Sequence, residues 1–455
     1  MSSPIKGFRA SFLDAIADPF YIPESNCIRY FPDGLLVVEH GKVKALGNYE
    51  QIHSQYTDIP ITHYPDRLIV SGFIDTHIHF PQTEMIASYG EQLLEWLSTY
   101  TFPTERKFAD RNYALEIASL FLDELLRNGT TTALVFTAVF PQSTDAFFEE
   151  AQRRNLRMIA GKVMMDRNAP EFLRDTATSS YLETKQLIEK WHKRDRLLYA
   201  VTPRFAITST SEQLTNAGKL LAEFPDVYLH THLSENVDEV QAVADFFPES
   251  DGYLDVYDRA GLVGERSIFA HGVQLNDREF ARLSEAKSAI AFCPTSNLFL
   301  GSGLFKLEKA KSLDTPIKVG LGTDVGAGTS FSILRTASAA YQVAQLRSQK
   351  LSAFQALFLA TLGGAIALSL DDKLGNFEIG KEADFVVLNL RSTPIMALRN
   401  KLSNQSDQSD QTAITLAEIS DQLFATIIMG DDRAIAATYI MGELAYSPKV
   451  SITLK

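Results

Sequence analysis

Two histidines, one residue apart, end an apolar run near the start of the chain. The segment "VSGFIDTHIHFPQ" covers residues 70–82 and contains His77 and His79. Side chains at positions i and i+2 of a strand point to the same side, so both imidazoles can converge on one point. Imidazole is a common metal ligand. The pair alone is also compatible with packed or surface histidines, so a metal site needs further ligands.

Further polar side chains lie at or near the ends of other apolar runs. His232 is late in "VYLHTHLSE" (227–235), His271 ends the apolar part of "SIFAHGV" (267–273), and Asp324 ends "IKVGLGTD" (317–324). Three imidazoles and a carboxylate around an open position make a catalytic zinc site in which water is the remaining ligand. The chain therefore predicts one metal centre assembled from distant segments.

The run 227–235 offers two histidines and one acid. His230 and His232 lie on the same face of the predicted strand, and His232 is nearer its end, so we predict His232 as the ligand and His230 as a hydrogen-bonded core residue. Glu235 follows the strand, where a carboxylate beside a metal-bound water is suited to proton transfer. Glu235 could also be the first-turn acid of a helix capped by Ser234, and the two roles are compatible.

Short β-rich runs that alternate with helical stretches would position these side chains. Eight runs are present, at residues 68–75, 130–137, 157–166, 198–205, 227–235, 267–273, 289–297 and 317–324. This alternation is typical of parallel βα units, and eight of them predict an α/β fold with a (β/α)8 barrel. The carboxyl ends of barrel strands meet at one mouth, where such enzymes have their active sites. The barrel would thus bring the candidate ligands together.

Strand-like sequence flanks the predicted barrel on both sides. It includes "LLVVEHGKVKAL" near the N-terminus, and "LGNFEIGKEADFVVLNL" and "RAIAATYIMGELAYS" after the last helical stretch, 352–370. We therefore predict a small β-sandwich-like domain from residues 1–67 and 376–455, and a barrel domain over residues 68–375. The polar stretch 403–412 is predicted to be a mobile surface loop.

Composition limits the partners that the chain can have. The 455 residues carry a net charge of −13, which disfavours nucleic acid and anionic membranes as partners. Cys27 and Cys293 are the only cysteines, so a disulfide framework is not expected and a reducing cytoplasm is. No apolar run approaches the length of a membrane span. We expect a cytoplasmic protein that binds neither nucleic acid nor membrane.

Several segments together resemble the guanine deaminases of the amidohydrolase superfamily. They are "GFIDTHIHFPQ", "LLEWLSTYTFPTE", "TPRFAITST", "THLSEN", "AHG", "FCPTSNLFLGSGLF" and "GLGTDVGAG", within residues 68–390. The histidine and aspartate pattern resembles that of the superfamily as a whole, whereas "HFPQ", "LLEWL" and "PRF" resemble the guanine-specific members. One departure is Ser71, where a proline usually precedes "GFID", away from the chemistry.

The resemblance implies a metal centre and its proton-transfer residues. His77, His79, His232 and Asp324 match zinc ligands, with one zinc per chain. Glu235 matches the general acid, and His271 matches a histidine near the attacking water. The family relationship also implies a homodimer.

The resemblance further implies the residues that hold a purine. Gln82, Arg204 and Phe205 match purine-binding positions, and His232, Glu235 and Asp324 would also contact the substrate. An arginine fork suits the O6 and N7 acceptors of guanine, and an amide can donate and accept on another edge. Arg204 could instead form a surface ion pair, and Trp96 could stack on the purine or be a plain core residue.

These assignments imply hydrolytic deamination of guanine to xanthine and ammonia. Zinc lowers the pKa of bound water from 15.7 to about 7. Asp324 and His271 could take the water's proton, and Glu235 could protonate N3 while C2 is attacked. Alternatives are another superfamily aminohydrolase acting on a different purine, pyrimidine or triazine, and a non-catalytic scaffold, although no ligand or proton-transfer residue is missing.

Two other kinds of metal site are disfavoured by the sequence. Hydantoinase-type relatives use a carbamylated lysine at the end of the fourth strand, where this chain has "TPRF". The cytidine-deaminase zinc site needs His-x-Glu and Pro-Cys-x-x-Cys, and neither motif occurs.

Overall fold

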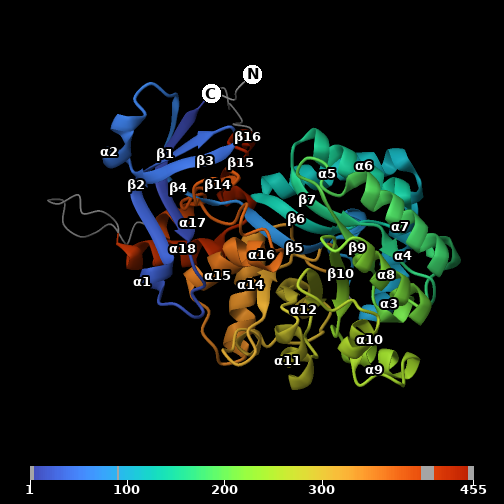
Figure 1. The fold of residues 1–455 in the computed structure, drawn as a ribbon. Coiled ribbons are helices and arrows are strands. Elements are labelled where there is room, and N and C mark those ends of the chain that lie inside the picture. The colour runs from blue at the N-terminus through green and yellow to red at the C-terminus, as the bar shows by residue number, and fades with distance from the viewer. Residues whose placement is uncertain (1–4, 90–91, 401–414, 449–455) are drawn as a thin grey trace.

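Two sheets organise the chain. The computed structural model describes residues 5–89, 92–400 and 415–448, so the predicted loop at 403–412 lies outside the described residues (Figure 1). One sheet forms the barrel, and the other combines strands from both ends of the chain, seen in Figure 1 as blue and orange-red arrows lying together.

The barrel sheet follows the order of the sequence. Its strands are β5 (Phe73–His79), β6 (Thr130–Phe136), β7 (Arg157–Gly161), β9 (Leu198–Pro203), β10 (Tyr228–Leu233), β11 (Ser267–His271), β12 (Ala289–Phe292) and β13 (Lys318–Leu321). Neighbouring strands in this order are parallel, and the short β8 (Val163–Met164) also pairs with β9. Two backbone hydrogen bonds draw β5 to the segment after β13: Asp324 N–H donates to His77 O, and His79 N–H donates to Val325 O, both at 2.9 Å. The predicted (β/α)8 barrel is confirmed.

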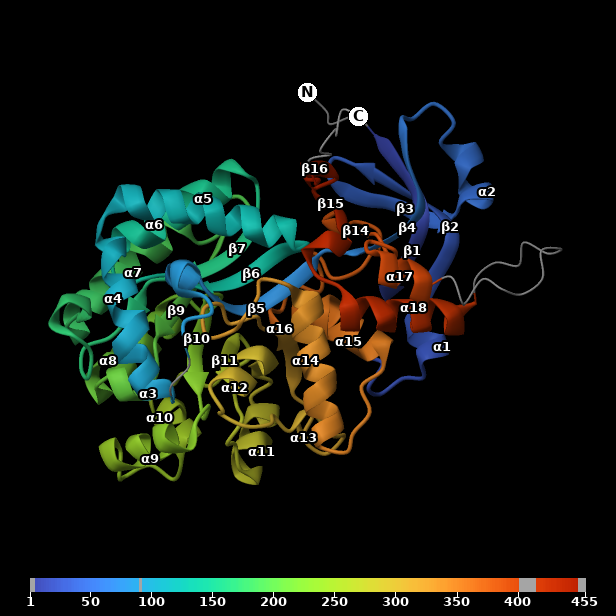
Figure 2. The ribbon, with the colours of Figure 1, turned by 180° about the vertical axis from the view of Figure 1, so that it is seen from behind.

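Helices lie around the barrel strands, as the rear view also shows (Figure 2). They are α5 (Arg111–Arg127), α6 (Pro141–Arg153), α7 (Ala177–Trp191), α8 (Ser211–Glu223), α9 (Val237–Phe246), α10 (Tyr253–Arg259), α11 (Asp277–Glu285), α12 (Pro294–Phe299), α13 (Leu307–Ala310), α14 (Ile333–Leu346), α15 (Ala353–Ala360) and α16 (Leu362–Ala367). The single helix predicted at 352–370 is wrong, because Thr361, at φ −131° and ψ −97°, separates α15 from α16.

The terminal sheet has seven strands in the order β16-β15-β14-β4-β1-β2-β3. They are β1 (Lys6–Ala15), β2 (Ile28–Glu39), β3 (Lys42–Asn48), β4 (Ile61–Ser71), β14 (Phe385–Leu388), β15 (Ile435–Ile440) and β16 (Glu443–Tyr446). Because β4 pairs in parallel with β1 and antiparallel with β14, it joins the two ends of the chain. In the part of the chain that the structure describes, the α-helices that accompany this sheet in the sequence are α1 (Glu24–Cys27), α2 (Tyr49–Ile52), α17 (Pro394–Arg399) and α18 (Leu416–Met429). The predicted β-unit from both termini is confirmed, while its sandwich-like form and the exact domain boundaries stay a prediction.

The first predicted barrel strand, 68–75, is wrong because it spans both sheets. Leu68–Ser71 pair with β14 in the terminal sheet, and the barrel strand begins only at Phe73. Gly72 lies between them, and a Cβ there would be 2.1 Å from Oγ1 of Thr131, so a side chain would not fit. The corrected strand β5 extends to His79 and therefore contains both candidate ligands.

A buried ion network connects the barrel to the terminal sheet. Arg157 Nε and Arg196 Nη2 each donate to Glu382 Oε2 at 2.7 Å, and Arg196 Nη2 also donates to Asp384. Glu382 and Asp384 immediately precede β14, so the network fixes that strand against the N-terminal side of the barrel.

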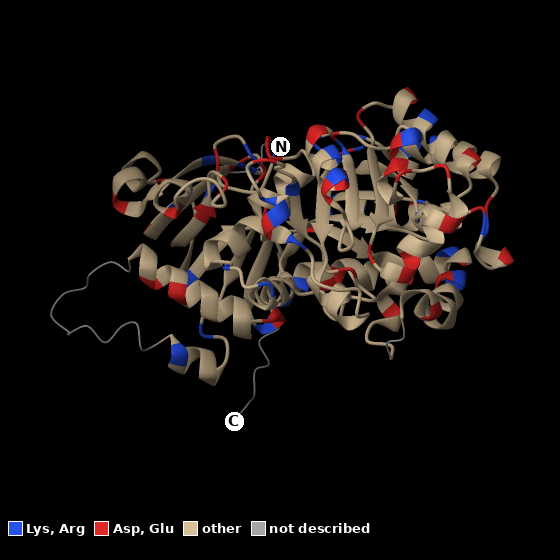
Figure 3. Ribbon diagram, turned by 90° about the horizontal axis from the view of Figure 1, so that it is seen from below, with Lys and Arg blue, Asp and Glu red and all other residues tan. Residues whose placement is uncertain are grey.

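Charged side chains of both signs are mixed over the described residues. In Figure 3, lysines and arginines are interspersed with aspartates and glutamates along the visible helices and loops. Among the residues that the structure describes, no helix combines the length and apolar character needed to cross a bilayer.

Candidate metal centre and active site

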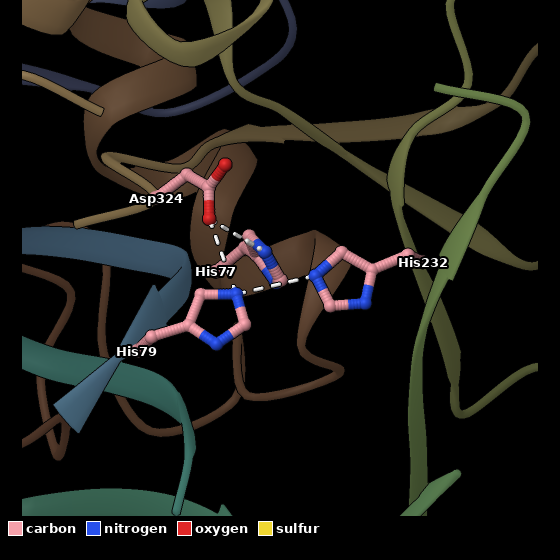
Figure 4. Close-up of side chains that lie close together, drawn as sticks. All are labelled: His77, His79, His232 and Asp324. Carbon is pink, nitrogen blue, oxygen red and sulfur yellow. Dashed lines mark hydrogen bonds and ion pairs between the residues drawn. The ribbon is translucent and has the colours of Figure 1, made fainter. Parts of the chain in front are cut away.

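Four side chains converge at the mouth of the barrel (Figure 4). His77 and His79 come from β5, His232 from β10, and Asp324 from the turn after β13. One ligand atom from each of these buried residues lies within 4.8 Å of the others. Asp324 Oδ1 is 3.1 Å from His77 Nε2 and 3.2 Å from His79 Nε2, and the Nε2 atoms of His79 and His232 are 3.2 Å apart.

The three spacings of 3.1–3.2 Å suit a tetrahedral metal ion, within a set of ligand atoms that spans up to 4.8 Å. Ligand atoms 2.0–2.1 Å from a tetrahedral zinc lie about 3.3 Å apart, close to the spacings found here. Burial lowers the pKa of His79 to about 3 and the pKa of His232 well below its usual value, so both imidazoles are neutral. Burial alone would raise the pKa of Asp324, but the adjacent histidines, His77 foremost, hold it well below its usual range. Neutral imidazoles and an ionised carboxylate are the ligand forms that a metal requires.

Hydrogen bonds to the ring nitrogens that face away from the cluster orient two of the imidazoles. His232 Nδ1 lies 2.7 Å from the carbonyl oxygen of Arg204, so Nδ1 carries the proton and the Nε2 lone pair is directed into the cluster. His77 Nδ1 lies 2.8 Å from Nε2 of the fully buried His230. His230 is thus the hydrogen-bonded core residue predicted from the sequence, one pleat below the cluster.

Glu235 and His271 lie beside this cluster. His271 Nε2 is 3.5 Å from Glu235 Oε2 and 3.8 Å from Asp324 Oδ2. Burial, reinforced by the negative charge of Asp324, raises the pKa of Glu235 to about 8. A carboxyl group that holds its proton near neutral pH can act as a general acid.

Two side chains that the sequence analysis missed contact this pair. Ser302 Oγ donates to Glu235 Oε1 at 3.0 Å, and His271 Nδ1 lies 2.9 Å from Asn297 Oδ1. Both residues belong to "FCPTSNLFLGSGLF", which was used only for the family resemblance. Polar side chains within a largely apolar segment are the signal by which these two residues could have been found.

The helix start predicted at Ser234 is wrong. The N-cap of α9 is Asn236, whose side chain forms a capping box with Glu239. Glu235 therefore precedes the helix, and Ser234 has φ +49°, a left-handed backbone like those of His271 (+75°) and Asp324 (+52°). Such conformations cost roughly 1–3 kcal/mol each and cluster at functional sites.

A cavity opens onto the cluster. Every residue predicted to act on substrate or metal lines it except the fully buried His77. The lining includes His79, Gln82, Arg204, Phe205, His232, Glu235, His271 and Asp324. Trp96 also lines it and is 1% exposed, and its indole nitrogen has no hydrogen-bond partner among the described residues.

Arg204 is buried, so the alternative of a surface ion pair is wrong. Its Nη1 donates to both carboxylate oxygens of Glu105 at 2.9 Å, and the two side chains are 3% and 1% exposed. Gln82 Nε2 donates to the same carboxylate at 3.3 Å. Glu105 ends the short helix α4 (Phe102–Glu105) and was the last residue of the quoted "LLEWLSTYTFPTE", but nothing local indicated its partner.

Comparison with known proteins places this constellation in a family. Residues 68–445 match the amidohydrolase family. The chain belongs to that family. This amidohydrolase is 53% identical over 446 residues to the guanine deaminase of Escherichia coli (strain K12), which covers 97% of the chain and 98% of that relative.

Solved structures agree with this relationship. The crystal structure of guanine deaminase from Bradyrhizobium japonicum superposes with a TM-score of 0.94 at 42% identity, covering 98% of this amidohydrolase and 100% of that chain. Guanine deaminase from C. acetobutylicum, solved with guanine bound in its active site, gives a TM-score of 0.85 at 28% identity, covering 97% and 100%. The resemblance to guanine deaminases seen in the sequence is confirmed, and the protein is a hydrolase.

Proposed function

We propose that this amidohydrolase hydrolyses guanine to xanthine and ammonia, with one zinc ion held by His77, His79, His232 and Asp324. The observation that carries the proposal is one cavity lined both by His79, His232 and Asp324 of this ligand set and by the buried Arg204 and Gln82. The relatives named guanine deaminase support the same substrate.

The protein side chains divide the proton transfers between them. Zinc at this position supplies a Lewis acid that lowers the pKa of water from 15.7 to about 7. Asp324 and His271, 3.8 Å apart, are placed to accept the proton that the attacking water loses. Glu235, protonated near neutral pH, delivers a proton to N3 of guanine and so makes C2 more electrophilic. The proton taken from the water then passes from Asp324 and His271 to the exocyclic amine, and the C2–N bond breaks to release ammonia. The hydroxyl group on C2 returns its proton to Glu235 and becomes the carbonyl.

Recognition of the base uses the other wall of the cavity. Arg204 carries donors that suit the O6 and N7 acceptors of guanine, and Gln82 offers an amide to another edge. Phe205 is 4% exposed and adds an apolar surface for the ring. Adenine has an amine donor in place of O6 and no amine at C2, so it would face Arg204 donor to donor.

The test is a substrate panel with the zinc-loaded protein. Guanine, adenine, cytosine, adenosine and ammeline are incubated separately, and ammonia release and metal content are measured. We expect guanine to be the preferred substrate and about one zinc per chain. Faster turnover of another heterocycle would assign the protein to a sister aminohydrolase, and two tightly bound metals would refute the proposed centre. The homodimer and the cytoplasmic location stay predictions.

A further inference from the structure

Glu105, at the end of α4, contacts both Arg204 and Gln82 at the wall of the cavity. We infer that Glu105 balances the charge of Arg204, so that the pocket selects a neutral carbonyl-bearing edge of the base over an anionic one. This specificity role rests on the proposed function, because it assumes that a purine base lies against Arg204.

The ion pair is enclosed. Arg204 Nη1 contacts both oxygens of Glu105 at 2.9 Å, and neither side chain exposes more than 3% of its surface. The guanidinium also lies over the ring of Phe102, 5.7 Å from its centroid. A buried guanidinium without a counter-charge would attract an anion strongly, since desolvated charges must be paired. With Glu105 in place, that pairing is complete before any ligand enters.

The same carboxylate fixes the orientation of Gln82. The backbone N–H of Gly326 donates to Gln82 Oε1 at 3.1 Å, and Gln82 Nε2 donates to Glu105 at 3.3 Å. A backbone N–H needs an acceptor and a carboxylate needs a donor, so both contacts permit only one orientation of the amide. Gln82 keeps one N–H and one oxygen lone pair for a ligand, which complements a neutral amide-like edge.

The preference for a neutral ligand over an anionic one follows from the charges on this wall of the cavity. Glu105 and Arg204 sum to zero, so a neutral carbonyl leaves this wall of the cavity neutral, whereas an anion adds one negative charge that no cation of the wall balances. Removing the charge of Glu105 reverses this order, because the guanidinium then pairs with the anion. Glu105 therefore acts as a positioning and specificity residue through Arg204 and Gln82.

Glu105→Gln tests this with two non-reacting purines, hypoxanthine as the neutral ligand and purine-6-carboxylate as the anion. Dissociation constants are measured by calorimetry on zinc-loaded protein, beside KM and kcat for guanine. We expect hypoxanthine to bind ~10-fold more weakly, because Arg204 and Gln82 lose the carboxylate that holds them toward its carbonyl edge. We expect purine-6-carboxylate to bind ~10-fold more tightly, because the guanidinium gains a charge-assisted contact with it. The guanine KM should rise more than kcat falls.

Two controls separate charge from structure. Glu116→Gln removes the same charge from an exposed position on α5 and should change neither of the two dissociation constants. Glu105→Asp keeps the charge and should keep the preference for hypoxanthine, even if both ligands bind less tightly. Weaker binding of both ligands to the Glu105→Gln variant, or an unchanged ratio of their two dissociation constants, would overturn the inference.

The wild-type protein provides a further test that needs no substitution at Glu105. We expect it to bind hypoxanthine at least ~10-fold more tightly than purine-6-carboxylate, and the opposite order would refute the charge-balanced pocket even if Glu105→Gln failed to fold. These binding ratios do not depend on turnover. Absence of guanine deamination would therefore contradict the proposed function and leave the role of Glu105 to be decided by the ratios.

Discussion

Replacing Glu235 by glutamine should slow turnover while leaving the metal centre in place. The glutamine has the same size and can still accept the hydrogen bond from Ser302 Oγ, which is 3.0 Å from Oε1. It has no carboxyl proton to transfer to N3. Since Glu235 does not belong to the cluster formed by His77, His79, His232 and Asp324, zinc content should remain about one per chain.

The magnitude follows from the role of Glu235 as a general acid. Positioned acid–base groups contribute about 10²–10⁴-fold in rate, which corresponds to about 3–5 kcal/mol of barrier. The pKa of about 8 keeps most of the carboxyl groups protonated at pH 7, and the acid form is lost as pH rises through that value. Bound zinc would lower this pKa because a nearby positive charge favours the carboxylate. The alkaline fall of kcat/KM is therefore expected at or below pH 8 and should disappear in the variant.

A coupled ammonia assay at saturating guanine gives kcat, and atomic emission gives the zinc content of the same preparation. Ser302→Ala serves as the matched control, since it removes only a hydrogen bond to Glu235 and should cost less than ~10-fold. Turnover by Glu235→Gln above a tenth of wild type would refute the acid role, and loss of zinc would make Glu235 a ligand.

Three further outcomes are expected. His77→Ala should lose both zinc and activity while circular dichroism shows a folded barrel; retention of stoichiometric zinc would contradict the ligand set. Arg204→Ala should lower kcat/KM for guanine by at least ~10²-fold at unchanged zinc content, because a charge-assisted contact is worth ~1.5–3 kcal/mol and Glu105 is left unpaired; equal turnover would disprove the contact. Arg196→Met should lower the free energy of unfolding in urea by about 3–5 kcal/mol, because it leaves Asp384 buried without its partner. Burial already raises the pKa of Asp384, so this deficit should shrink as pH falls and the carboxyl group is protonated, and a pH-independent deficit would refute the explanation.

The sequence by itself determined the architecture and the cluster of His77, His79, His232 and Asp324 that could hold a metal. Alternation of β-rich and helical runs specifies parallel βα units, and a closed parallel barrel places all carboxyl strand ends at one mouth. His77 and His79 share a face because the strand period is two, and His232 is nearer the mouth than His230 for the same reason. These properties depend on local spacing and on a fold whose geometry is general, so they could be predicted from the chain.

Only the tertiary structure decided the contacts that tune the site. Glu105 pairs with Arg204 across 99 residues, and Asn297 reaches His271 across 26. A glutamate near the end of a short helix has the same local sequence pattern whether it faces solvent or a buried guanidinium. Whether it faces solvent or a guanidinium depends on the path of each loop over the barrel mouth. The change of sheet at Gly72 was likewise invisible, because residues 68–75 form one continuous β-rich run and only strand pairing divides it between two sheets.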